Sequence, residues 1–276
     1  MKNAKEIKEL VKEKYGQIAE ASNQNGCCGG TDGCAPDYSV FTDDYTDLKG
    51  HNPDADLGLG CGLPTEFAQI KEGDTVVDLG SGAGNDCFVA RAQTGNTGKV
   101  IGIDMTESMI DKARENANKL GFENIEFRLG EIEDLPLADA KVDVVVSNCV
   151  FNLVPDKEKA FAETYRILKP GGHFSISDVV ITGELPEGLR DSAEAYAGCV
   201  AGAIDKELYL ETIKKAGFSN IKIQKEKEIQ LPESLLNEHL SPDQVQKYHQ
   251  SGLGIYSITV YAEKEDENCC GPTCCD

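Results

Sequence analysis

The sequence predicts an α/β fold, in which helices cover a largely parallel β-sheet. Short segments rich in β-branched residues recur from Asp74 onward, with the sequences TVVDLG, KVIGID, NIEFRL, VDVVVSN and HFSISDVV. Helix-like stretches separate these segments, and this alternation is typical of parallel sheets, whose strands need crossover connections. A glycine-rich turn follows the first segment, as in open α/β sheets that bind a ligand at the carboxyl ends of their strands.

The first half of the chain contains an amphipathic helix, a loop and the start of the sheet. Residues 3–20 place Ile7, Leu10, Val11 and Ile18 among Lys and Glu, which is the spacing of an amphipathic helix. Residues 21–50 lose this periodicity and are rich in Gly, Asn, Asp and Pro, which indicates a loop. The helices between the strands are expected at 85–93, 106–120 and 157–168, with Thr106 as N-cap and Gly121 as stop signal of the second.

The pattern becomes less regular toward the C-terminus. The sequence KPGG at 169–172 predicts the end of the third helix and a turn before the next strand. Residues 184–204 are expected to form a helical, lid-like segment, and residues 205–217 another amphipathic helix. Two late strands, at 219–228 and 254–263, are expected to extend the sheet, and the polar end of the chain is expected to be mobile.

Composition limits the possible partners. The 276 residues include 27 Lys and Arg against 48 Asp and Glu, a formal net charge of −21. This charge repels nucleic acids and anionic membrane surfaces, so neither is expected as a partner. The chain contains no apolar run of membrane-spanning length and begins without a signal-peptide pattern, so we expect a cytoplasmic protein. Because no apolar interface helix stands out, we expect a monomer.

The glycine-rich turn predicts a ligand site. Gly80, Gly82 and Gly84 give the spacing G-x-G-x-G between a buried strand and a helix, where glycine allows a tight turn and close approach of a ligand. Asn85 stands where a dinucleotide fingerprint needs glycine, which disfavours a pyrophosphate cofactor. Asp104, at the end of the next strand, is placed to bind a ribose diol. A simple strand-to-helix turn remains an alternative.

Eleven cysteines are the compositional anomaly. Their number is odd, so intramolecular disulfides cannot use all of them, and clustered thiols in a reducing compartment are more often metal-binding or catalytic than structural. Cys149 follows a strand at the carboxyl edge of the sheet and is expected to face the ligand crevice. Each cysteine alone could equally be a small core residue. Cys87 is assigned to packing, because it begins a helix on the side that faces the sheet.

The series DLGSGAG, Asp104, GEIEDLPL and LKPGG resembles class I S-adenosylmethionine-dependent methyltransferases over about residues 64–180. The resemblance implies a Rossmann-like sheet and S-adenosylmethionine as cofactor. It places Asp78 near the methionine end, Asp104 on the ribose, and Ile132 and Glu133 beside the adenine. The full set of expected cofactor-binding residues is Asp78, Gly80, Ser81, Gly82, Gly84, Asp86, Asp104, Met105, Ile132, Glu133 and Asn148, with Asn152 as a further candidate.

The strings GCGLP, GSGAGNDC, GIDMT, SNCVFNLVPDK and ISDV resemble one branch more closely, the arsenite S-adenosylmethionine methyltransferases, from Cys61 to about Phe218. This resemblance implies methyl transfer to arsenite and methylarsenite, in arsenic detoxification or volatilisation. It implies that Cys61, Cys149 and Cys199 bind trivalent arsenic. It also implies a further N-terminal cysteine, for which Cys34 is the nearest candidate and Cys27 and Cys28 are alternatives.

The resemblance also suggests how the chemistry proceeds. Trivalent arsenic is thiophilic, and three thiolates leave it with an exposed lone pair as the nucleophile, so no general base is required. Because methylation formally oxidises arsenic, we expect Cys34 and Cys61 to act as a redox pair that thioredoxin or glutathione restores. A small-molecule C- or O-methyltransferase of the quinone-biosynthesis type, and a non-catalytic thiol-rich metalloid-binding protein, remain alternative functions.

The sequence patterns and the resemblance together imply four segments. They are an N-terminal helix and Cys-rich loop (1–50), a cofactor-binding methyltransferase domain (51–180), a C-terminal arsenic-binding part (181–263) and a Cys-rich tail (264–276). The tail carries Cys269, Cys270, Cys274 and Cys275, whose spacing is not that of a standard zinc finger. Vicinal thiols of this kind chelate trivalent arsenic, so deletion of residues 269–276 is expected to weaken arsenite capture while maximal turnover persists.

Overall fold

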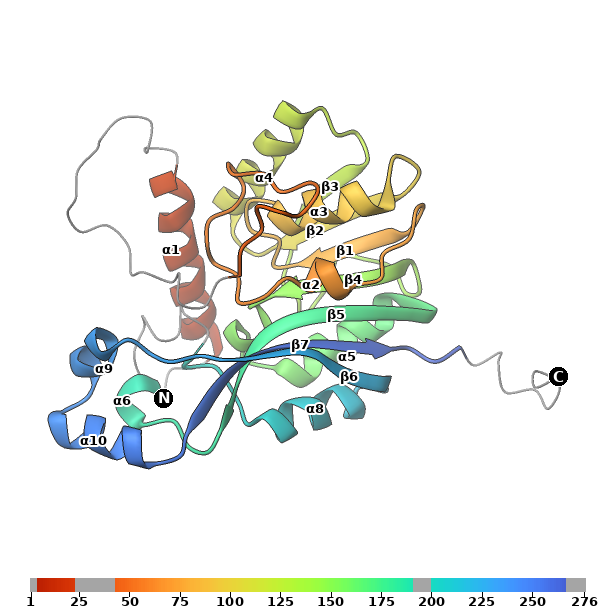
Figure 1. Cartoon of the computed structure of the whole chain (residues 1–276). Coiled ribbons are helices and arrows are strands. Elements are labelled where there is room, and N and C mark those ends of the chain that lie inside the picture. The colour runs from red at the N-terminus through yellow and green to blue at the C-terminus, as the bar shows by residue number, and fades with distance from the viewer. Residues whose placement is uncertain (1–3, 23–42, 191–199, 267–276) are drawn as a thin grey trace, which may run out of the picture.

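A seven-stranded sheet organises the computed structural model, which describes residues 4–22, 43–190 and 200–266. The strand order is β3-β2-β1-β4-β5-β7-β6, and Figure 1 shows the strands in this order from top to bottom. All neighbouring pairs are parallel except those made by β7, which runs antiparallel to both β5 and β6. The strands are β1 (Thr75–Leu79), β2 (Lys99–Asp104), β3 (Ile125–Leu129), β4 (Val142–Asn148), β5 (Leu168–Thr182), β6 (Ser219–Glu228) and β7 (Gly254–Glu263).

Most of the predicted helices form, and their ends have local causes. In α4, Met109, Ile110, Ala113 and Ala117 share one buried face, and Gly121 ends the helix in the left-handed conformation. In α8, the Asp205 side chain accepts hydrogen bonds from the first backbone N–H groups. The helices are α1 (Ala4–Ser22), α2 (Pro64–Phe67), α3 (Asn85–Thr94), α4 (Glu107–Leu120), α5 (Lys157–Ile167), α6 (Glu187–Arg190), α8 (Lys206–Lys215), α9 (Glu233–His239) and α10 (Pro242–Gln250), with a 3-10 turn, η2 (Phe151–Leu153).

The sheet is buried on both faces, because helices pack against each of them. Successive residues of its central strands point to opposite sides and therefore enter different cores. Val76 of β1 belongs to a core that includes Phe88 of α3 and Ile110 of α4. The next residue, Val77, belongs to the opposite core, with Phe161 of α5 and Tyr209 of α8. This double burial explains why the central strand segments are almost entirely hydrophobic in sequence.

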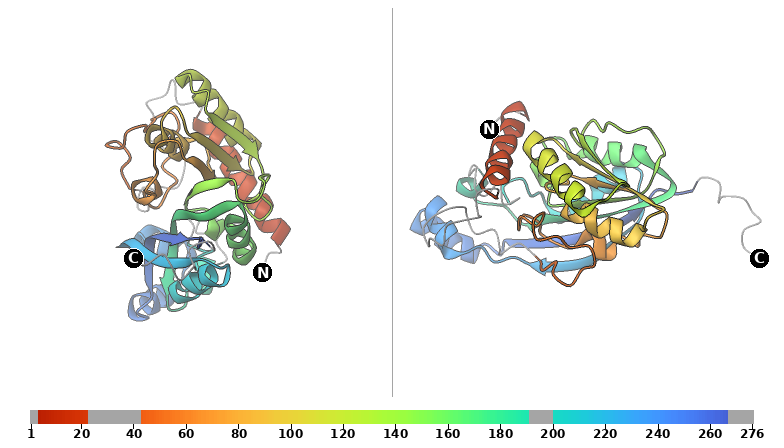
Figure 2. Two further views of the ribbon diagram at one scale, coloured as in Figure 1. Left: turned by 90° about the vertical axis from the view of Figure 1, so that its right-hand side faces the viewer. Right: turned by 90° about the horizontal axis from the view of Figure 1, so that it is seen from above.

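A third core lies at the carboxyl edge of the parallel strands. Thr182 at the end of β5 pairs with Gly254 at the start of β7, and Figure 1 shows α1, α6, α9 and α10 gathered at this end of the molecule. This core joins Val11 of α1 to Cys61 and Cys149. Helix α1 also packs against α4, beside which Figure 2 shows it in red. The N-terminal helix therefore lies where a ligand of the sheet would bind.

Two expectations require correction. The KPGG segment does not form a turn between helix and strand, because β5 already begins at Leu168 and includes it. Gly171 adopts a φ of +78°, and the pairing register with β4 shifts between Val142 and Val144, so the break is absorbed as an irregularity within the strand. The helix predicted over 184–204 does not extend to its expected ends, because residues 184–186 and 200–204 are not helical. Residues 187–190 form α6, and residues 191–199 lie outside the described residues.

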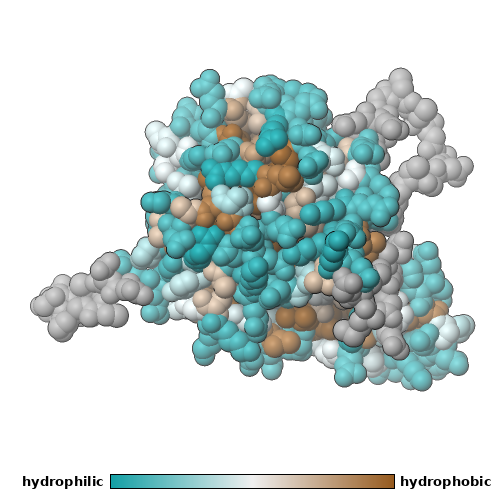
Figure 3. Space-filling view, turned by 180° about the vertical axis from the view of Figure 1, so that it is seen from behind, coloured by the Kyte–Doolittle hydropathy of each residue, from teal (hydrophilic) through white to brown (hydrophobic). Residues whose placement is uncertain are grey.

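The surface is mostly hydrophilic. Seen from behind in Figure 3, hydrophilic side chains cover most of the surface, and hydrophobic ones gather in small areas between them. None of the helices within residues 4–22, 43–190 and 200–266 combines the length and hydrophobicity needed to cross a bilayer.

Candidate active site

A pocket opens at the carboxyl ends of β1, β2 and β4. Most of the expected cofactor-binding residues line this pocket, and Gly84 is the exception. Gly84 is instead the N-cap of α3 with a φ of +99°, and a Cβ there would meet Phe127 and Phe88 at 3.0 Å. The lining residues from the expected set are Asp78, Gly80, Ser81, Gly82, Asp86, Asp104, Met105, Ile132, Glu133 and Asn148.

The glycine loop is held open toward the pocket. The backbone N–H of Gly82 donates to Asp104 Oδ2 at 3.0 Å, and that of Thr106 donates to Asp104 Oδ1 at 2.8 Å. Asp104 thus fixes the loop, although burial raises the pKa of its carboxyl. The Ser81 hydroxyl is buried without a hydrogen-bond partner among the described residues. Because buried polar atoms are normally hydrogen-bonded, a polar group of a ligand or a water molecule in the pocket would satisfy this hydroxyl.

Asp78 and Cys87 form a buried pair below the loop. The Cys87 thiol donates to Asp78 Oδ2 at 3.3 Å, and both side chains are almost fully enclosed. Burial, followed by the nearby Asp86 carboxylate, raises the pKa of Asp78 well above its usual range. Cys87 therefore packs beneath the loop and supports a pocket carboxylate.

Asp86 connects the pocket to three neighbouring segments. Its carboxylate accepts hydrogen bonds from the Tyr45 hydroxyl at 2.8 and 3.0 Å and from Asn148 Nδ2 at 3.3 Å. It also accepts one from the Thr65 hydroxyl at 3.4 Å. Burial raises the pKa of Asp86 to about 6, although the hydrogen bonds from Tyr45, Asn148 and Thr65 oppose this shift.

Helix α1 closes the far end of the pocket through ion pairs. Lys8 Nζ lies 2.7 Å from Glu131 Oε2 and also pairs with Glu133. Glu133 additionally accepts a hydrogen bond from the backbone N–H of Asp156 at 3.1 Å. Since Val11 and Tyr15 line the same pocket, α1 forms one of its walls.

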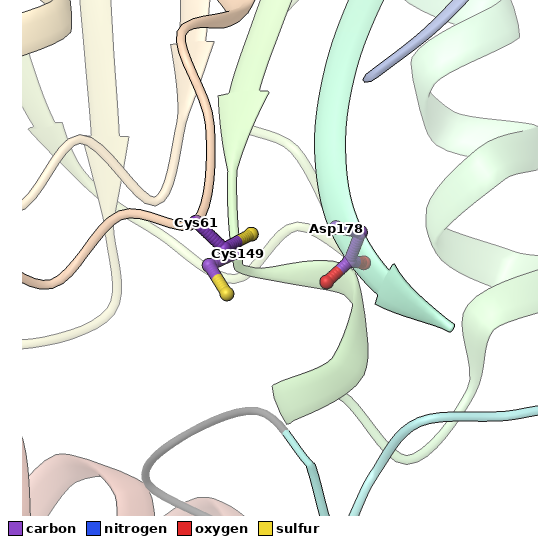
Figure 4. Close-up of side chains that lie close together, drawn as sticks. All are labelled: Cys61, Cys149 and Asp178. Carbon is purple, nitrogen blue, oxygen red and sulfur yellow. The ribbon is translucent and has the colours of Figure 1, made fainter. Parts of the chain in front are cut away.

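Two of the predicted cysteines meet although they lie far apart in the sequence. Cys61, on the loop before α2, and Cys149, directly after β4, are both buried and carry thiols rather than disulfides. Their Sγ atoms and a carboxylate oxygen of Asp178 all lie within 4.8 Å of one another. Figure 4 shows these three side chains gathered between the loop, the end of β4 and the end of β5.

Backbone geometry fixes both thiols. Cys149 has a φ of +61°, and its N–H donates to the Ser177 carbonyl oxygen at 2.7 Å, so the chain turns sharply at the strand end. The N–H of Cys61 donates to Asn148 Oδ1 at 3.0 Å, and the hydroxyl of Ser257 donates to the carbonyl of Cys61. The cysteine before α2 is thus tied to β4 and β7.

The third member of the cluster, Asp178, is fully buried on β5. It accepts hydrogen bonds from the Tyr209 hydroxyl at 3.2 Å and from the N–H of Val179 at 3.0 Å. Burial raises the pKa of its carboxyl to about 7, and the positive charge of Lys157 opposes this shift. Sequence reasoning missed Asp178 as a site residue, although ISDV was noted.

Several expected residues lie elsewhere. Asn152 is buried on η2, where its side chain donates to the Val179 carbonyl, and it is not among the pocket-lining residues. Tyr45 was not anticipated, because no local motif marks a tyrosine in an irregular segment. Cys199, Cys34, Cys27 and Cys28, and the four tail cysteines, lie outside the described residues.

Comparison with known proteins relates this arrangement to a family. A family model described as a methyltransferase domain matches residues 70–236. An arsenite methyltransferase of Halobacterium salinarum is 45% identical over 235 residues, covering 80% of this chain and 60% of that protein. An arsenite methyltransferase of Aquipseudomonas alcaligenes is 34% identical over 242 residues, covering 84% of this chain and 68% of that protein. The chain belongs to the arsenite methyltransferase family.

A solved structure extends the comparison to the fold. The arsenic(III) S-adenosylmethionine methyltransferase of Chlamydomonas reinhardtii matches with a TM-score of 0.65 and 34% identity, covering 85% of this chain and 76% of that chain. The Rossmann-like methyltransferase fold is therefore confirmed. The chain spans about 60% of the length of the arsenite methyltransferase from Halobacterium salinarum.

The pocket fits the cofactor of this family. The open glycine loop, the Ser81 hydroxyl that no described residue pairs with, and the Asp104 carboxylate at the end of β2 match a ligand with hydroxyl and charged groups. A Cβ at Gly82 would meet nothing within 4 Å, so space remains directly over the loop. The donor set is consistent with S-adenosylmethionine.

Proposed function

We propose that this chain transfers methyl groups from S-adenosylmethionine to trivalent arsenic bound by cysteine thiolates. The observation that carries the proposal is the convergence of Cys61 and Cys149 beside the pocket of a methyltransferase fold. Cys149 itself lines the pocket, so an arsenical bound there would adjoin the cofactor. The family membership supports the same assignment.

The residues lining the pocket would hold the cofactor. In this proposal Asp104 binds the ribose hydroxyls, Ile132 and Glu133 flank the adenine, and the loop from Gly80 to Gly82 carries the amino-acid end near Asp78. The remaining members are Ser81, Asp86, Met105 and Asn148. When bound, S-adenosylmethionine supplies an electrophilic methyl group on a sulfonium sulfur.

The cysteines would bind and orient the arsenical. Thiolates are soft ligands that suit trivalent arsenic better than carboxylates do. Each thiol that binds replaces a hydroxide of arsenite, and the thiol proton leaves with that hydroxide as water. With Cys199 as third ligand, arsenic keeps a lone pair that carries no proton. The site therefore needs thiols to position the nucleophile, and no general base.

A reductant completes the proposed cycle. Donation of the arsenic lone pair to carbon leaves arsenic formally pentavalent, so a second methylation requires two electrons. We assign these electrons to a thiol pair that closes to a disulfide, with Cys34 and Cys61 as the pair, and thioredoxin or glutathione as the source of reduction. We propose a cytoplasmic location, where thioredoxin and glutathione keep thiols reduced. We also propose that the chain is a monomer.

The decisive experiment is a methylation assay of the purified chain. Labelled S-adenosylmethionine, arsenite and a thiol reductant are incubated with the protein, and arsenic species are separated chromatographically. We expect labelled methylarsenicals from the parent chain and none from Cys149→Ser, while Cys87→Ser keeps most of the activity. Label transfer to a small organic acceptor but not to arsenite would instead favour a quinone-type methyltransferase. Arsenite binding with no methyl transfer to any acceptor would favour a non-catalytic metalloid-binding protein.

A further inference from the structure

We propose that Cys61, Cys149 and Asp178 form a binding site for a thiophilic divalent cation of the zinc type. The three potential ligand atoms lie within 4.8 Å of one another and come from three different segments, as Figure 4 shows. In a tetrahedral zinc site with metal–sulfur distances of about 2.3 Å, neighbouring ligand atoms lie roughly 3.3–3.8 Å apart. Side-chain rotations that move the ligand atoms closer by about 1 Å would therefore complete the site.

The donor set indicates which ion would bind. Two thiolates and one carboxylate suit a borderline-soft dication such as zinc, whereas trivalent arsenic is satisfied by sulfur alone. The three donors carry a charge of about −3 when ionised, which a dication reduces to about −1 in a buried setting. Water can occupy the fourth position, since Cys149 borders the pocket.

The surroundings already orient the carboxylate. The Asp178 carboxylate accepts three hydrogen bonds, from the Tyr209 hydroxyl at Oδ2, from the Val179 N–H at Oδ1 and from the backbone N–H of Asn152. An ionised carboxylate has about four acceptor sites, so one remains to bind a cation. Hydrogen bonds of this kind hold metal-binding carboxylates in place in known metal sites.

Binding is an exchange without oxidation or reduction. The cation loses water molecules, Cys61 and Cys149 lose their thiol protons to solvent, and two sulfur–metal bonds and one oxygen–metal bond form. If the proposed function is correct, this cation and the arsenical compete for the same two sulfurs. Zinc would then inhibit methyl transfer, and arsenite in excess or a chelator would relieve the inhibition.

Cobalt(II) is the probe, since it replaces zinc and absorbs light when thiolates bind it. The full chain is used with eight cysteines outside the site changed to Ser, Cys199 among them, so that they do not bind cobalt. We expect one cobalt per chain, with thiolate-to-cobalt absorption. Asp178→Asn should weaken cobalt binding by about tenfold or more. The background changes are Cys27→Ser, Cys28→Ser, Cys34→Ser, Cys199→Ser, Cys269→Ser, Cys270→Ser, Cys274→Ser and Cys275→Ser.

Matched controls separate the site from general effects. Cys87→Ser removes a buried thiol outside the cluster, and Asp143→Asn removes a carboxylate from the other end of β4, so neither should change the affinity for cobalt. Asp178→Cys replaces the oxygen donor with sulfur and should intensify the thiolate band. This variant also tests the site if the Asn substitution prevents folding.

Arsenite binding provides the remaining control. Asp178→Asn should keep its arsenite affinity within about twofold, because arsenic uses sulfur ligands. The assignment fails if Asp178→Asn binds cobalt as tightly as its parent, if Cys61→Ser or Cys149→Ser keeps the full thiolate band, or if Asp178→Asn loses arsenite and cobalt alike. Cobalt is measured without S-adenosylmethionine, so a chain that binds it but makes no methylarsenical refutes only the proposed function.

Discussion

The side chain of Asn148 makes hydrogen bonds toward both halves of the candidate site. Its Oδ1 accepts from the N–H of Cys61, and its Nδ2 donates to the Gly62 carbonyl at 2.8 Å and to the Tyr45 hydroxyl at 2.6 Å. The same amide reaches Asp86 in the pocket. Position 148 therefore links the segment that carries Cys61 to the cofactor pocket.

Removal of this amide should disturb the position of Cys61. We expect Asn148→Ala to lower kcat with arsenite about tenfold, equivalent to about 1.4 kcal/mol of activation free energy. The KM for arsenite should rise as well, because the Cys61 loop loses its hydrogen bond. Asn118→Ala, on the outer part of α4, is the control. Steady-state kinetics at saturating cofactor make the measurement, and an unchanged KM for arsenite would argue against a positioning role.

Two glycines of the loop should respond differently to an added methyl group. Both have positive φ, +72° at Gly80 and +49° at Gly82, but a Cβ at Gly80 would lie 2.3 Å from a Val150 methyl carbon. Gly80→Ala should therefore destabilise the fold by roughly 2–4 kcal/mol, against about 1 kcal/mol for Gly82→Ala. Urea unfolding measures the free energies, and equal losses for the two variants would contradict this account.

At the scale of elements, α1 is held over the pocket by charge. Lys8 and Glu133 are largely buried, with side chains 23% and 6% exposed, whereas Lys5 is 84% exposed beside Glu9. Buried partners depend on each other, because removal of one leaves an uncompensated charge, while exposed pairs contribute little.

The two lysines provide a matched comparison. Lys8→Met is expected to lower the free energy of unfolding by roughly 1–3 kcal/mol and to weaken binding of S-adenosylmethionine, because Glu133 loses its partner. Lys5→Met should change either quantity by less than about 0.5 kcal/mol. Calorimetric titration and thermal unfolding provide the two measurements. Similar effects of both substitutions would mean that α1 does not depend on this ion pair.

Local signals predicted most elements well. The β4 segment VDVVVSN forms a strand over the same residues, and the expected late strands at 219–228 and 254–263 are confirmed as β6 and β7. The KPGG segment was wrongly predicted as a turn, because its glycines can also adopt an irregular strand when a neighbouring strand supplies pairing. The helix of 184–204 was predicted too long at its ends, since residues 184–186 and 200–204 are not helical.

At the scale of the whole molecule, burial of carboxyl groups makes stability depend on pH. The pKa of Asp86 is raised to about 6 in the folded protein, above the value of about 3.9 expected when unfolded. Between these values the folded state binds more protons than the unfolded state, so this residue lowers stability as pH rises from about 4 to about 6.

Asp86→Asn removes this titration. The difference in unfolding free energy, variant minus parent, should increase by about 1–3 kcal/mol between pH 4 and pH 6 and then remain level. Taking the difference cancels the opposite effect of carboxylates such as Glu126, whose pKa is lowered to about 2 by hydrogen bonds from Arg128 and Lys99. Urea unfolding across this pH range makes the measurement, and a difference that falls with pH would refute the sign.

The sequence by itself determined the succession of strands and helices along the chain, the glycine loop and the carboxylates at strand ends, because these depend on patterns within a few residues. Only the tertiary structure decided that Asp178 joins Cys61 and Cys149, that Asn148 ties the Cys61 loop to the pocket, and that α1 forms a pocket wall. Such contacts join residues far apart along the chain. They depend on strand order and packing, which no local pattern encodes.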